Sequence, residues 1–509
     1  MTGVELEGLL TALRRFFASQ GAEAYVVGGF LRDTLLGRPS RDLDLAVTGD
    51  ADALARRLAD TLGGAYVPLD ESHGIFRVVL AGHSGPVDVV DLSRLRGDLL
   101  QDLAERDFTV DAMAAPLEGF RLDGEAAVTD PFGGREDLRR RVIRMVRPEV
   151  FRDDGLRLMR AARLAAELAF ELDGATVEQA RADAGCIERP SPERKRDELC
   201  KIMATRRAAR ALRQLDEMTV LTRLIPELEA CRGTDQPLEH YWDVFNHSIE
   251  AVAAFDFMLE RRAPRNRRLA RFWRDLWDGF GWVPNLPDLF EEEVREGVPR
   301  KAVDKIAALL HDIGKPRTKS LGRDGRIHFF GHAELGAELA TGIMRRFRFS
   351  RRETEMVRTI VDQHLRPGQL STKGPPTRRA LYRYFRDLGE VAVDVLFLNL
   401  ADHLAARGPT MHPRAWKAHV GYMEYVVRKR YEEESIVRPP KLISGHDVMQ
   451  EFGLTPGPVI GRLLAAVQEA QAAGEVTTRE EALELVRREL EQERLAGVGG
   501  AGGQRRGDG

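Results

Sequence analysis

The residues best suited to chemistry in the N-terminal part of the chain are two carboxylates, Asp42 and Asp44, in an apolar run that ends at Val47. Side chains two residues apart on a β-strand point to the same face. Two adjacent carboxylates repel each other, and a divalent cation bound by hard oxygen ligands relieves that repulsion. The pair therefore predicts a Mg²⁺ site with Asp42 and Asp44 as catalytic ligands.

A glycine pair and an arginine precede these carboxylates. Gly28 and Gly29 predict a turn in which backbone N–H groups can approach a phosphate closely. Arg32 can offer its planar guanidinium to the same phosphate. The order of glycine turn, arginine and paired aspartates, between two apolar strands, predicts a site for a metal–nucleotide complex.

A third carboxylate is expected on a later strand, because metal-assisted phosphoryl transfer neutralises a triphosphate and orients the attacking hydroxyl. Asp88 and Asp91 both lie in the run VDVVDL. Their spacing of three puts them on opposite faces of a strand, so one metal cannot use both. We favour Asp88 as the third catalytic carboxylate.

Further charged residues follow in two segments. Arg106 is a candidate nucleotide contact, and Asp107 is a candidate N-cap for the helix expected after it. In FRDDGLRLMRAARLAAELAF, polar residues recur every three positions, which predicts a stripe along one helix. A carboxylate and a guanidinium on such a stripe can accept from and donate to the edge of a base. The stripe comprises Asp154, Arg157, Arg160 and Arg163.

A second group of chemistry-bearing residues is spread through the helical middle of the chain. In ALLHDIGKP, an adjacent His-Asp pair ends an apolar helix, which places an imidazole beside a carboxylate. Mixed nitrogen and oxygen ligands suit one or two transition-metal ions such as Mn²⁺, Co²⁺, Ni²⁺ or Fe²⁺. The candidate ligands are His247, His311, Asp312, His332, His364 and Asp402.

The elements that must position these residues are of two kinds. Strands are expected at 24–27, 43–47, 76–80 and 87–92, with helices at 5–20 and 51–63, and helical periodicity dominates from Pro148 onward. Residues 262–300, rich in Arg, Trp and Pro, predict an irregular insert. The fold class expected is α+β: a mixed-sheet head at 1–146, then a helical neck at 147–235, a helical metal-binding domain at 236–430, a small helical tail at 431–496 and a disordered Gly-rich end at 497–509.

Composition restricts the class of protein. A chain of 509 residues is too long for one core, and 43% hydrophobic with 31% charged residues is typical of a globular protein. The net charge of −3 means that any nucleic-acid contact depends on local basic patches. Three cysteines without a CxxC pair, the lack of a signal-like N-terminus and the lack of a run of about eighteen apolar residues predict a cytoplasmic protein with no membrane span.

Five motifs in this order, GGFLRD, DLD, ERDFTVDAMA, DPFGG and DDGLR, resemble the class II tRNA nucleotidyltransferase family, which includes CCA-adding, C-adding and A-adding enzymes and bacterial poly(A) polymerases. The resemblance covers residues 1–235. It implies that Gly29 and Arg32 contact nucleotide phosphates, that Asp42 and Asp44 hold Mg²⁺, that Arg106 contacts the nucleotide, and that Asp154 and Arg157 read the base with Arg160 nearby.

The chain departs from the family pattern near the triphosphate. Glu105 stands where the family usually has Arg, and Asp111 where it has Asn. The later histidines resemble the HD superfamily of metal-dependent phosphohydrolases, and the full order H…HD…H…H…D is present.

The leading hypothesis is addition of CMP and AMP, from CTP and ATP, to tRNA 3′ ends without a nucleic-acid template, with HD-domain phosphodiesterase or phosphatase activity as a further possibility. One alternative is an A-adding, C-adding or poly(A) polymerase of the same family. The other is an HD phosphohydrolase whose head only binds RNA or a nucleotide.

Overall fold

Two strands rich in β-branched and aliphatic residues pair in parallel at the centre of the N-terminal sheet. In the computed structural model they are β2 (Asp42–Val47) and β5 (Val89–Arg94). The structure describes residues 3–71, 74–80, 87–122, 127–371, 374–432 and 440–500. The described residues form two compact units, Met1–Pro226 and Glu227–Gly509, and each is treated by itself.

The sheet of the first unit is mixed, with the strand order β3-β4-β5-β2-β1-β6. All its other neighbouring strands pair antiparallel. The remaining strands are β1 (Ala24–Val27), β3 (Ala65–Asp70), β4 (Ile75–Val79) and β6 (Ala114–Pro116). The four expected strands are present within a residue or two, whereas β3 and β6 were not predicted from the sequence.

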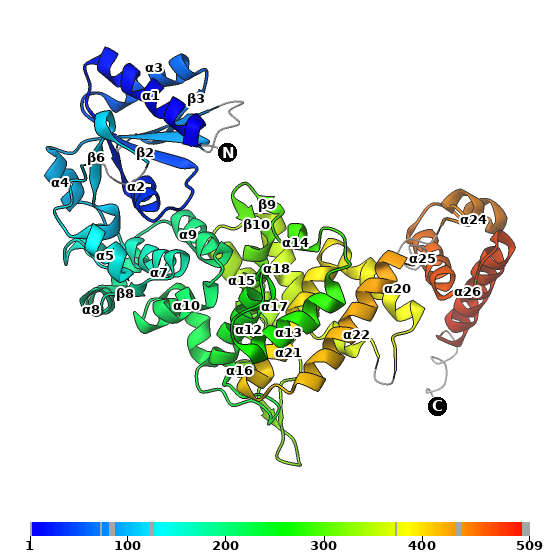
Figure 1. Ribbon diagram of the computed structural model, residues 1–509. Helices are drawn as coiled ribbons and strands as arrows, with labels where there is room; N and C mark the ends of the chain where they lie inside the picture. The colour runs from blue at the N-terminus through cyan, green and yellow to red at the C-terminus, as the bar shows by residue number, and fades with distance from the viewer. Residues whose placement is uncertain are drawn as a thin grey trace, which may run out of the picture. The chain divides into compact units, whose positions relative to one another are not determined.

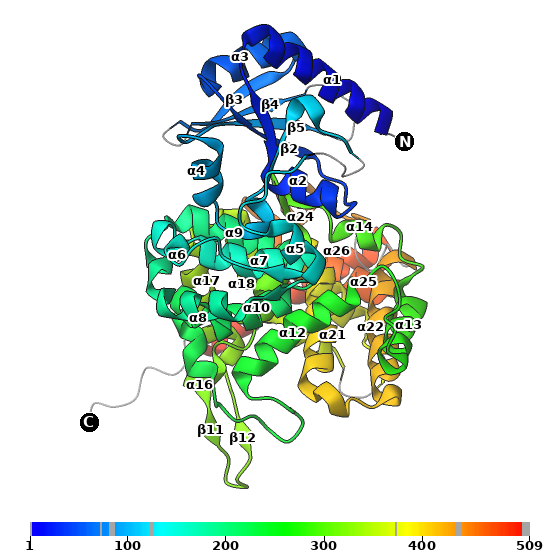
Figure 2. The ribbon, with the colours of Figure 1, turned by 60° about the vertical axis from the view of Figure 1, so that its left-hand side comes forward.

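Helices cover both sides of this sheet. Figures 1 and 2 show α1 (Gly3–Gln20) and α3 (Ala51–Leu62) on one face, with α2 (Gly28–Leu35) and α4 (Leu99–Ala104) on the other side. Local signals set the helix ends: Asp50 caps α3 by accepting from the backbone of Asp52 and Ala53, and Gly63 ends it with φ of 65°.

The rest of the first unit is helical. Its elements are η1 (Thr109–Asp111), η2 (Leu117–Gly119), α5 (Gly134–Arg140), α6 (Val150–Asp153), α7 (Arg157–Leu168), α8 (Gly174–Ala182), η3 (Ala184–Glu188), α9 (Pro192–Ala204), α10 (Ala208–Glu217) and α11 (Leu221–Leu224), with a short parallel pair of β7 (Val142–Ile143) and β8 (Glu171–Leu172). Helix α7 packs against α9 and α10. Its apolar face is largely buried and includes Leu158, Met159 and Leu164.

Five helices surround the buried histidines of the second unit: α12 (Val244–Met258), α15 (Arg300–Leu310), α17 (His332–Arg346), α18 (Arg351–Gln363) and α21 (Ala392–Arg407). Around them lie η4 (Pro226–Cys231), α13 (Arg267–Phe280), α14 (Leu286–Leu289), β9 (Glu293–Arg295), β10 (Val298–Pro299), α16 (Lys315–Thr318), β11 (Ser320–Leu321), β12 (Ile327–His328), α19 (Arg366–Gln369), α20 (Arg378–Leu388), η5 (Gly389–Val391), η6 (Gly408–Thr410) and α22 (Pro413–Glu432).

The expectation of an irregular insert at 262–300 is wrong in its first half. Residues Arg267–Phe280 form helix α13, capped by the Asn266 side chain. Phe272, Leu276 and Phe280 are buried at a spacing of four, which is the period of one helix face. The abundance of Arg and Trp obscured this apolar stripe.

The last described segment is a small helical module of α24 (Gly445–Phe452), α25 (Pro458–Ala473) and α26 (Arg479–Gly500). Val448, Leu463, Val467 and Val486 are central to its own apolar core. Helix α26 extends to Gly500, beyond residue 496, where the sequence suggested the module would end. The rest of the expected disordered end lies outside the described residues. None of the helices in the described ranges combines the length and apolar character that a membrane crossing needs.

The fold is therefore of the predicted α+β class, a mixed-sheet head followed by helical structure.

Candidate active sites

The head contains a polar cleft of about 410 Å³, entirely within the first unit. Many residues singled out from the sequence line it, from β1, β2, the segment before η1, and the start of α7. The predicted residues in its lining are Gly28, Gly29, Asp44, Arg106, Asp154, Arg157 and Arg160. Asp42, Asp88, Arg32 and Arg163 are not in the lining.

The acidic end of the cleft is formed by two neighbouring strands. Asp44 on β2 lies directly opposite Asp91 on β5 in the parallel register, so both side chains leave the same face of the sheet. Burial, with the charge of Asp91 adding to it, raises the pKa of Asp44 to about 6. Asp42 begins β2 on the same face, and its pKa is also raised, mainly by burial. A bound cation would remove this unfavourable clustering of negative charge.

Asp88 does not join this group, contrary to the expectation from the sequence. Strand β5 begins at Val89, and Val89 pairs with Asp42, which places Asp88 on the opposite side of the sheet. Its carboxylate pairs instead with Arg41 at 2.6 Å, in solvent. Asp91 is the carboxylate beside Asp44, and Arg77 donates two hydrogen bonds of 2.8 Å to it. The parallel register of β2 and β5 determines that Asp91, and not Asp88, lies beside Asp44, and this register cannot be read from the sequence.

The glycine pair begins helix α2 beside Asp44. Gly28 has φ of 61°, and a Cβ there would lie 3.2 Å from Arg106 Nη1 and 3.3 Å from Asp44 Oδ2. Only glycine therefore meets both the backbone conformation and the limited space. The Phe30 N–H donates to Asp44 Oδ2 at 3.4 Å, so the amino end of α2 faces the acidic end of the cleft.

Arg32 is not in the lining of the cleft, but it holds a residue that is. It is buried, with 8% of its surface exposed, and Nη1 donates to Asp111 Oδ1 at 2.8 Å. Nε and Nη2 both donate to Asp33 at 3.1 Å. Asp111, which stands where the family pattern has Asn, lines the cleft, and the buried guanidinium of Arg32 balances its additional negative charge.

Arg106 and Asp107 have separate roles. Arg106 reaches the cleft, and its Nη2 donates to Asp102 at 3.2 Å. Asp107 is not the expected N-cap: Phe108 holds that position before η1. Burial favours the neutral form of Asp107, but Arg160, with Nε 2.6 Å from Oδ2, and Arg157 hold its pKa below the usual range.

The expected stripe of polar residues is divided by the structure. Asp154 precedes the helix in an extended conformation, and α7 begins only at Arg157. Asp154 pairs with Arg194 of α9 at 2.6 Å, and this pairing outweighs burial to lower its pKa. Arg157 Nη2 donates to the carbonyl of Glu105 at 2.8 Å. Asp154 and Arg157 thus share the cleft, each oriented by a different neighbour.

Arg163 lies further along α7, away from the cleft. Its Nε donates to Glu198 at 2.6 Å and its Nη1 donates to Glu167, in a nearly buried cluster that joins α7 to α9. Sequence reasoning missed two residues of this site. They are Arg194, which lies 40 residues after Asp154 in the chain, and Asp91, which the phase argument set aside in favour of Asp88.

The second unit brings together all the histidines and aspartates expected to bind metal. His247 comes from α12, His311 and Asp312 follow α15, and the remaining residues are His332, His364 and Asp402 of α17, the end of α18 and α21. The Nε2 atom of His247 lies 3.1 Å from that of His311 and 3.1 Å from Asp402 Oδ1. Asp312 is central: its oxygens lie 3.3 Å from the Nε2 atoms of His247 and His311, and 3.4 Å and 3.8 Å from those of His332 and His364.

Backbone hydrogen bonds orient three of the rings in the same way. The Nδ1 atoms of His311, His332 and His364 lie 2.6–2.8 Å from carbonyl oxygens three residues earlier. Nδ1 therefore carries the proton, and Nε2 points inward as a potential ligand atom. Burial lowers the pKa of His364 to about 4, whereas the nearby carboxylates of Asp312 and Asp402 overcome burial and raise the pKa of His311 to about 10.

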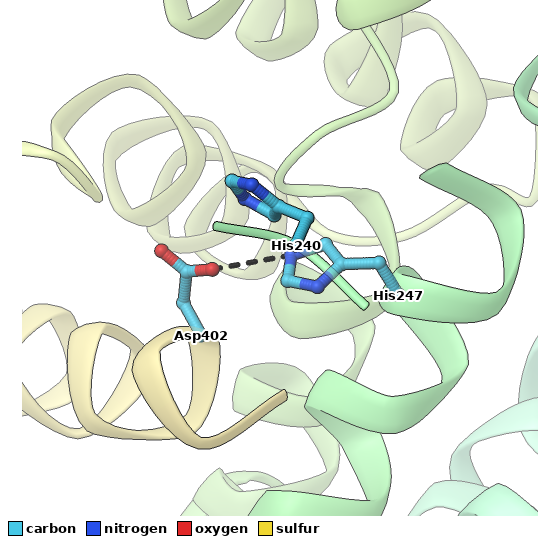
Figure 3. A group of neighbouring side chains, drawn as sticks. All are labelled: His240, His247 and Asp402. Atoms are coloured by element: carbon cyan, nitrogen blue, oxygen red, sulfur yellow. Dashed lines mark ion pairs between the residues drawn. The ribbon is translucent and has the colours of Figure 1, made fainter. Parts of the chain in front are cut away.

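Two additional residues belong to this centre. Lys315 Nζ lies 2.6 Å from Asp312 Oδ2, beneath the ligand cluster. His240, in the segment before α12, has a ligand atom within 4.8 Å of those of His247 and Asp402. Figure 3 shows the two rings and the carboxylate close together, with the ion pair from His247 to Asp402 dashed. The sequence analysis did not identify His240, because the residues around it do not show the ligand spacing of a metal-binding motif.

The donor set fits metal ions. His247, His311 and Asp312 form one group of ligand atoms within 4.8 Å of each other, and Asp312, His332 and His364 form another. Asp312 is common to both, as a carboxylate bridging two ions would be. The Nε2 atom of His332 is buried and makes no hydrogen bond within the described residues, so a ligand would satisfy it. Imidazole and carboxylate ligands together suit transition metals.

Three family profiles match the chain. The profile for the poly(A) polymerase head domain matches residues 24–144, the profile for the probable RNA and SrmB-binding site of polymerase A matches 169–232, and the profile for the HD domain matches 291–407. The first lies in the unit that carries the polar cleft, and the second lies in it up to Pro226. The third contains five of the six predicted histidine and aspartate ligands.

Relatives match over nearly the whole chain. The A-adding tRNA nucleotidyltransferase of Deinococcus radiodurans is 38% identical over 475 residues, which is 92% of this chain and 96% of the relative. The CC-adding tRNA nucleotidyltransferase of Thermus thermophilus is 34% identical over 470 residues, which is 90% of this chain and 92% of the relative.

Solved structures share the fold. A CCA-adding enzyme in complex with CTP has a TM-score of 0.61 at 22% identity and 96% coverage of both chains. The Thermotoga maritima CCA-adding enzyme in complex with tRNA has a TM-score of 0.58 at 22% identity, again covering 96% of both chains. With the close relatives and the three matched domains, these findings confirm the resemblance read from the motifs: the chain is an enzyme of the tRNA nucleotidyltransferase family with an HD domain.

Proposed function

We propose that the head adds CMP, AMP or both to the 3′ end of tRNA, using CTP and ATP and a template made of protein side chains. The observation that carries this proposal is the head cleft itself. Its acidic end holds Asp44 and Asp91, and the same cavity is lined by Asp154 and Arg157. A triphosphate site and a base-reading site are needed within the length of one nucleotide, and one cavity supplies both groups of residues.

In the reaction, the tRNA 3′ hydroxyl forms a bond to the α-phosphorus of the nucleotide, and pyrophosphate leaves. Asp42 and Asp44 would hold Mg²⁺, which when bound neutralises the triphosphate and orients the hydroxyl. Gly28 and Gly29 leave room for phosphate oxygens beside the amino end of α2. Arg106 reaches the same end of the cleft and would contact the nucleotide.

Base choice would rest on Asp154 and Arg157. A carboxylate accepts from the exocyclic amino group that both cytosine and adenine carry, and a guanidinium donates to ring nitrogen or carbonyl. Arg194 and the Glu105 carbonyl hold these two side chains in place. Arg160 acts through Asp107, which it holds ionised beside Arg157. Arg32 is a positioning residue that fixes Asp111, and Arg163 joins α7 to α9.

The nucleotides added distinguish CCA addition from the alternatives of A-only, C-only or poly(A) synthesis. The relatives include both A-adding and CC-adding enzymes. Purified protein with labelled tRNA ending at the discriminator base, or ending in CC, should be given CTP, ATP or both. Extension of the first substrate by three residues supports CCA addition. Extension only of the CC-ended tRNA by ATP, or only of the first by CTP, assigns a narrower activity, and no extension of either overturns the proposal.

We further propose that the HD domain is a metal-dependent phosphohydrolase, with Mn²⁺, Co²⁺, Ni²⁺ or Fe²⁺ held by His247, His311, Asp312, His332, His364 and Asp402. The complete ligand set and the inward Nε2 atoms support this. Hydrolysis of 2′,3′-cyclic phosphate ends in each metal tests it. The alternative function, an HD phosphohydrolase whose head only binds RNA or a nucleotide, is disfavoured. Binding alone does not require two carboxylates, Asp44 and Asp91, to lie side by side.

The domain boundaries inferred from sequence after residues 146, 235 and 430 are retained as part of this proposal, and the C-terminal helical module is extended to Gly500. Action in the cytoplasm, where tRNA is processed, is also part of the proposal.

A further inference from the structure

A second cleft, of about 540 Å³, opens beside the HD metal centre. His332, one of the metal-site histidines, lines it directly, and Gln363 and Leu365, on either side of His364, line it too. A ligand in this cleft can therefore have its reacting group at the metal centre and the rest of its structure outside. What the outer part recognises is not assigned by the HD ligand pattern.

The outer wall carries an aromatic ring in an unusual position. Phe330 is 78% exposed, although a large apolar side chain normally avoids water. It lies two residues before His332, on the chain that leaves the hairpin of β11 and β12, which Figure 2 shows projecting from the helices of this unit. The ring is stacked on His328, with centroids 5.1 Å apart and an interplanar angle of 13°. One face of Phe330 is thereby supported and its orientation is restricted.

The charged side chains of the cleft restrict which chemical groups of a ligand can lie beside them. Glu334 and Asp362 line it, and their carboxylates would repel a ligand that is anionic throughout. Arg366 also lines the cleft, but its guanidinium forms an ion pair with Asp387, with Nη2 2.6 Å from Oδ2. The phosphate of a ligand is therefore best placed at the metal centre, and an uncharged ring with hydrogen-bond donors is best placed toward the carboxylates and Phe330.

We infer that this cleft binds the terminal nucleotide of an RNA strand, with its base stacked on Phe330 and its phosphate directed to the metal centre. The inference rests on the proposed phosphohydrolase function of the HD domain and names its substrate class. Stacking on an exposed aromatic ring tolerates any base and is the usual way in which proteins hold unpaired nucleotides. Because Phe330 and the metal-site residue His332 line the same cleft, two residues apart in the chain, the stacked base and the reacting phosphate can belong to one nucleotide.

The test compares two substrates with the same reacting group, using the full-length protein in Mn²⁺. Cytidine 2′,3′-cyclic phosphate carries a base, and 1-O-methylribose 2,3-cyclic phosphate does not. Phe330→Ala should raise KM about tenfold for the cytidine substrate, because a stacked base typically contributes on the order of 1–3 kcal/mol. It should leave kcat and the base-free substrate unchanged within about twofold.

Two further variants separate stacking from a general effect on the hairpin. Phe330→Tyr keeps the ring and should retain the wild-type KM. Leu321→Ala removes another exposed apolar side chain of the same hairpin, 73% exposed and outside the cleft lining, and should change neither substrate. Equal effects of Phe330→Ala on both substrates, or no effect on either, would overturn the inference.

If the wild type hydrolyses neither substrate in any of the four metals, the phosphohydrolase proposal fails, and a binding measurement then decides this inference. 5-Iodocytidine 3′-phosphate, irradiated with the protein, should crosslink to the peptide that contains Phe330 in the wild type and not in Phe330→Ala. Absence of that crosslink in the wild type would overturn the inference by itself.

Discussion

Arg32 of α2 donates from Nη1 to Asp111 Oδ1 across 2.8 Å, and both residues are buried, with Asp111 in the lining of the head cleft. The pair joins the helix that begins at the glycine turn to the short helix η1. It also explains how the chain accommodates an aspartate at the position where the family pattern has an asparagine. In this structure the guanidinium of Arg32, expected to contact phosphate, donates to Asp111 and Asp33.

Arg32→Met should destabilise the first unit by about 3–5 kcal/mol, because it leaves the buried carboxylate of Asp111 without a partner. Asp111→Asn in the same chain should recover most of that loss. Urea unfolding of both variants and of the double variant measures it. If Arg32→Met instead left stability unchanged and only raised KM for nucleotides, Arg32 would be a direct phosphate contact.

Asp42→Ala and Asp44→Ala should each reduce nucleotide incorporation on the order of a thousandfold, because a metal ligand shared with the triphosphate is lost. Asp88→Ala is the matched control: it removes a carboxylate three residues before Asp91, just outside β5, that pairs with Arg41 in solvent, and activity should stay near that of the wild type. Incorporation of labelled CMP and AMP in Mg²⁺ is the measurement. Loss of activity in the control with retention in Asp44→Ala would reverse the assignment of carboxylates.

Arg157→Ala should impair base choice more than it slows the reaction. The variant loses a base-edge donor, and such a contact contributes about 1–3 kcal/mol of discrimination. Incorporation of UTP and GTP relative to CTP and ATP should rise accordingly, whereas Arg206→Ala, at an exposed arginine outside the cleft, should leave the ratio unchanged. A lower rate with an unchanged ratio would assign Arg157 to phosphate binding or to structure.

The double variant His311→Ala, Asp312→Ala should lose metal binding and any cyclic-phosphate hydrolysis while keeping tRNA extension in Mg²⁺. The two sites use different ligands, carboxylate oxygens in the head and mixed imidazole and carboxylate groups in the HD domain. His364→Ala, which leaves the pair of Asp312 and Lys315 intact, provides a second variant in case the first does not fold. Loss of extension in folded protein would show that the two activities are not separable.

His240→Ala should weaken metal binding at the HD centre by about tenfold to a hundredfold, the range seen when a group that supports a metal site is removed. Burial lowers the pKa of His240 to about 4, so its ring is neutral and able to act as a ligand at neutral pH. Titration with Mn²⁺, followed by metal analysis, measures the effect. His446→Ala, at an exposed histidine of the C-terminal module, is the control, and equal metal affinity in both variants would exclude a role for His240.

Several features of this protein follow from the sequence alone because they depend on neighbours along the chain. The spacing of Asp42 and Asp44 places them on one strand face whatever the rest of the fold does. Gly28 is explained by a local backbone angle, and the positions of β1, β2, α1 and α3 follow from their apolar periodicity. The ordered motifs were enough to indicate the enzyme family.

Other features were decided only by the tertiary structure, because they depend on which distant segments meet. Asp91 rather than Asp88 stands beside Asp44, since the parallel register of β2 and β5 sets the facing residues. Arg32 turns toward Asp111 because a buried carboxylate attracts the nearest cation. His240 joins His247 and Asp402 through packing of separate segments, for which no local spacing exists. Sequence periodicity determines which side chains share one face of a helix or strand. Which distant residues that face contacts depends on burial and charge in the folded chain.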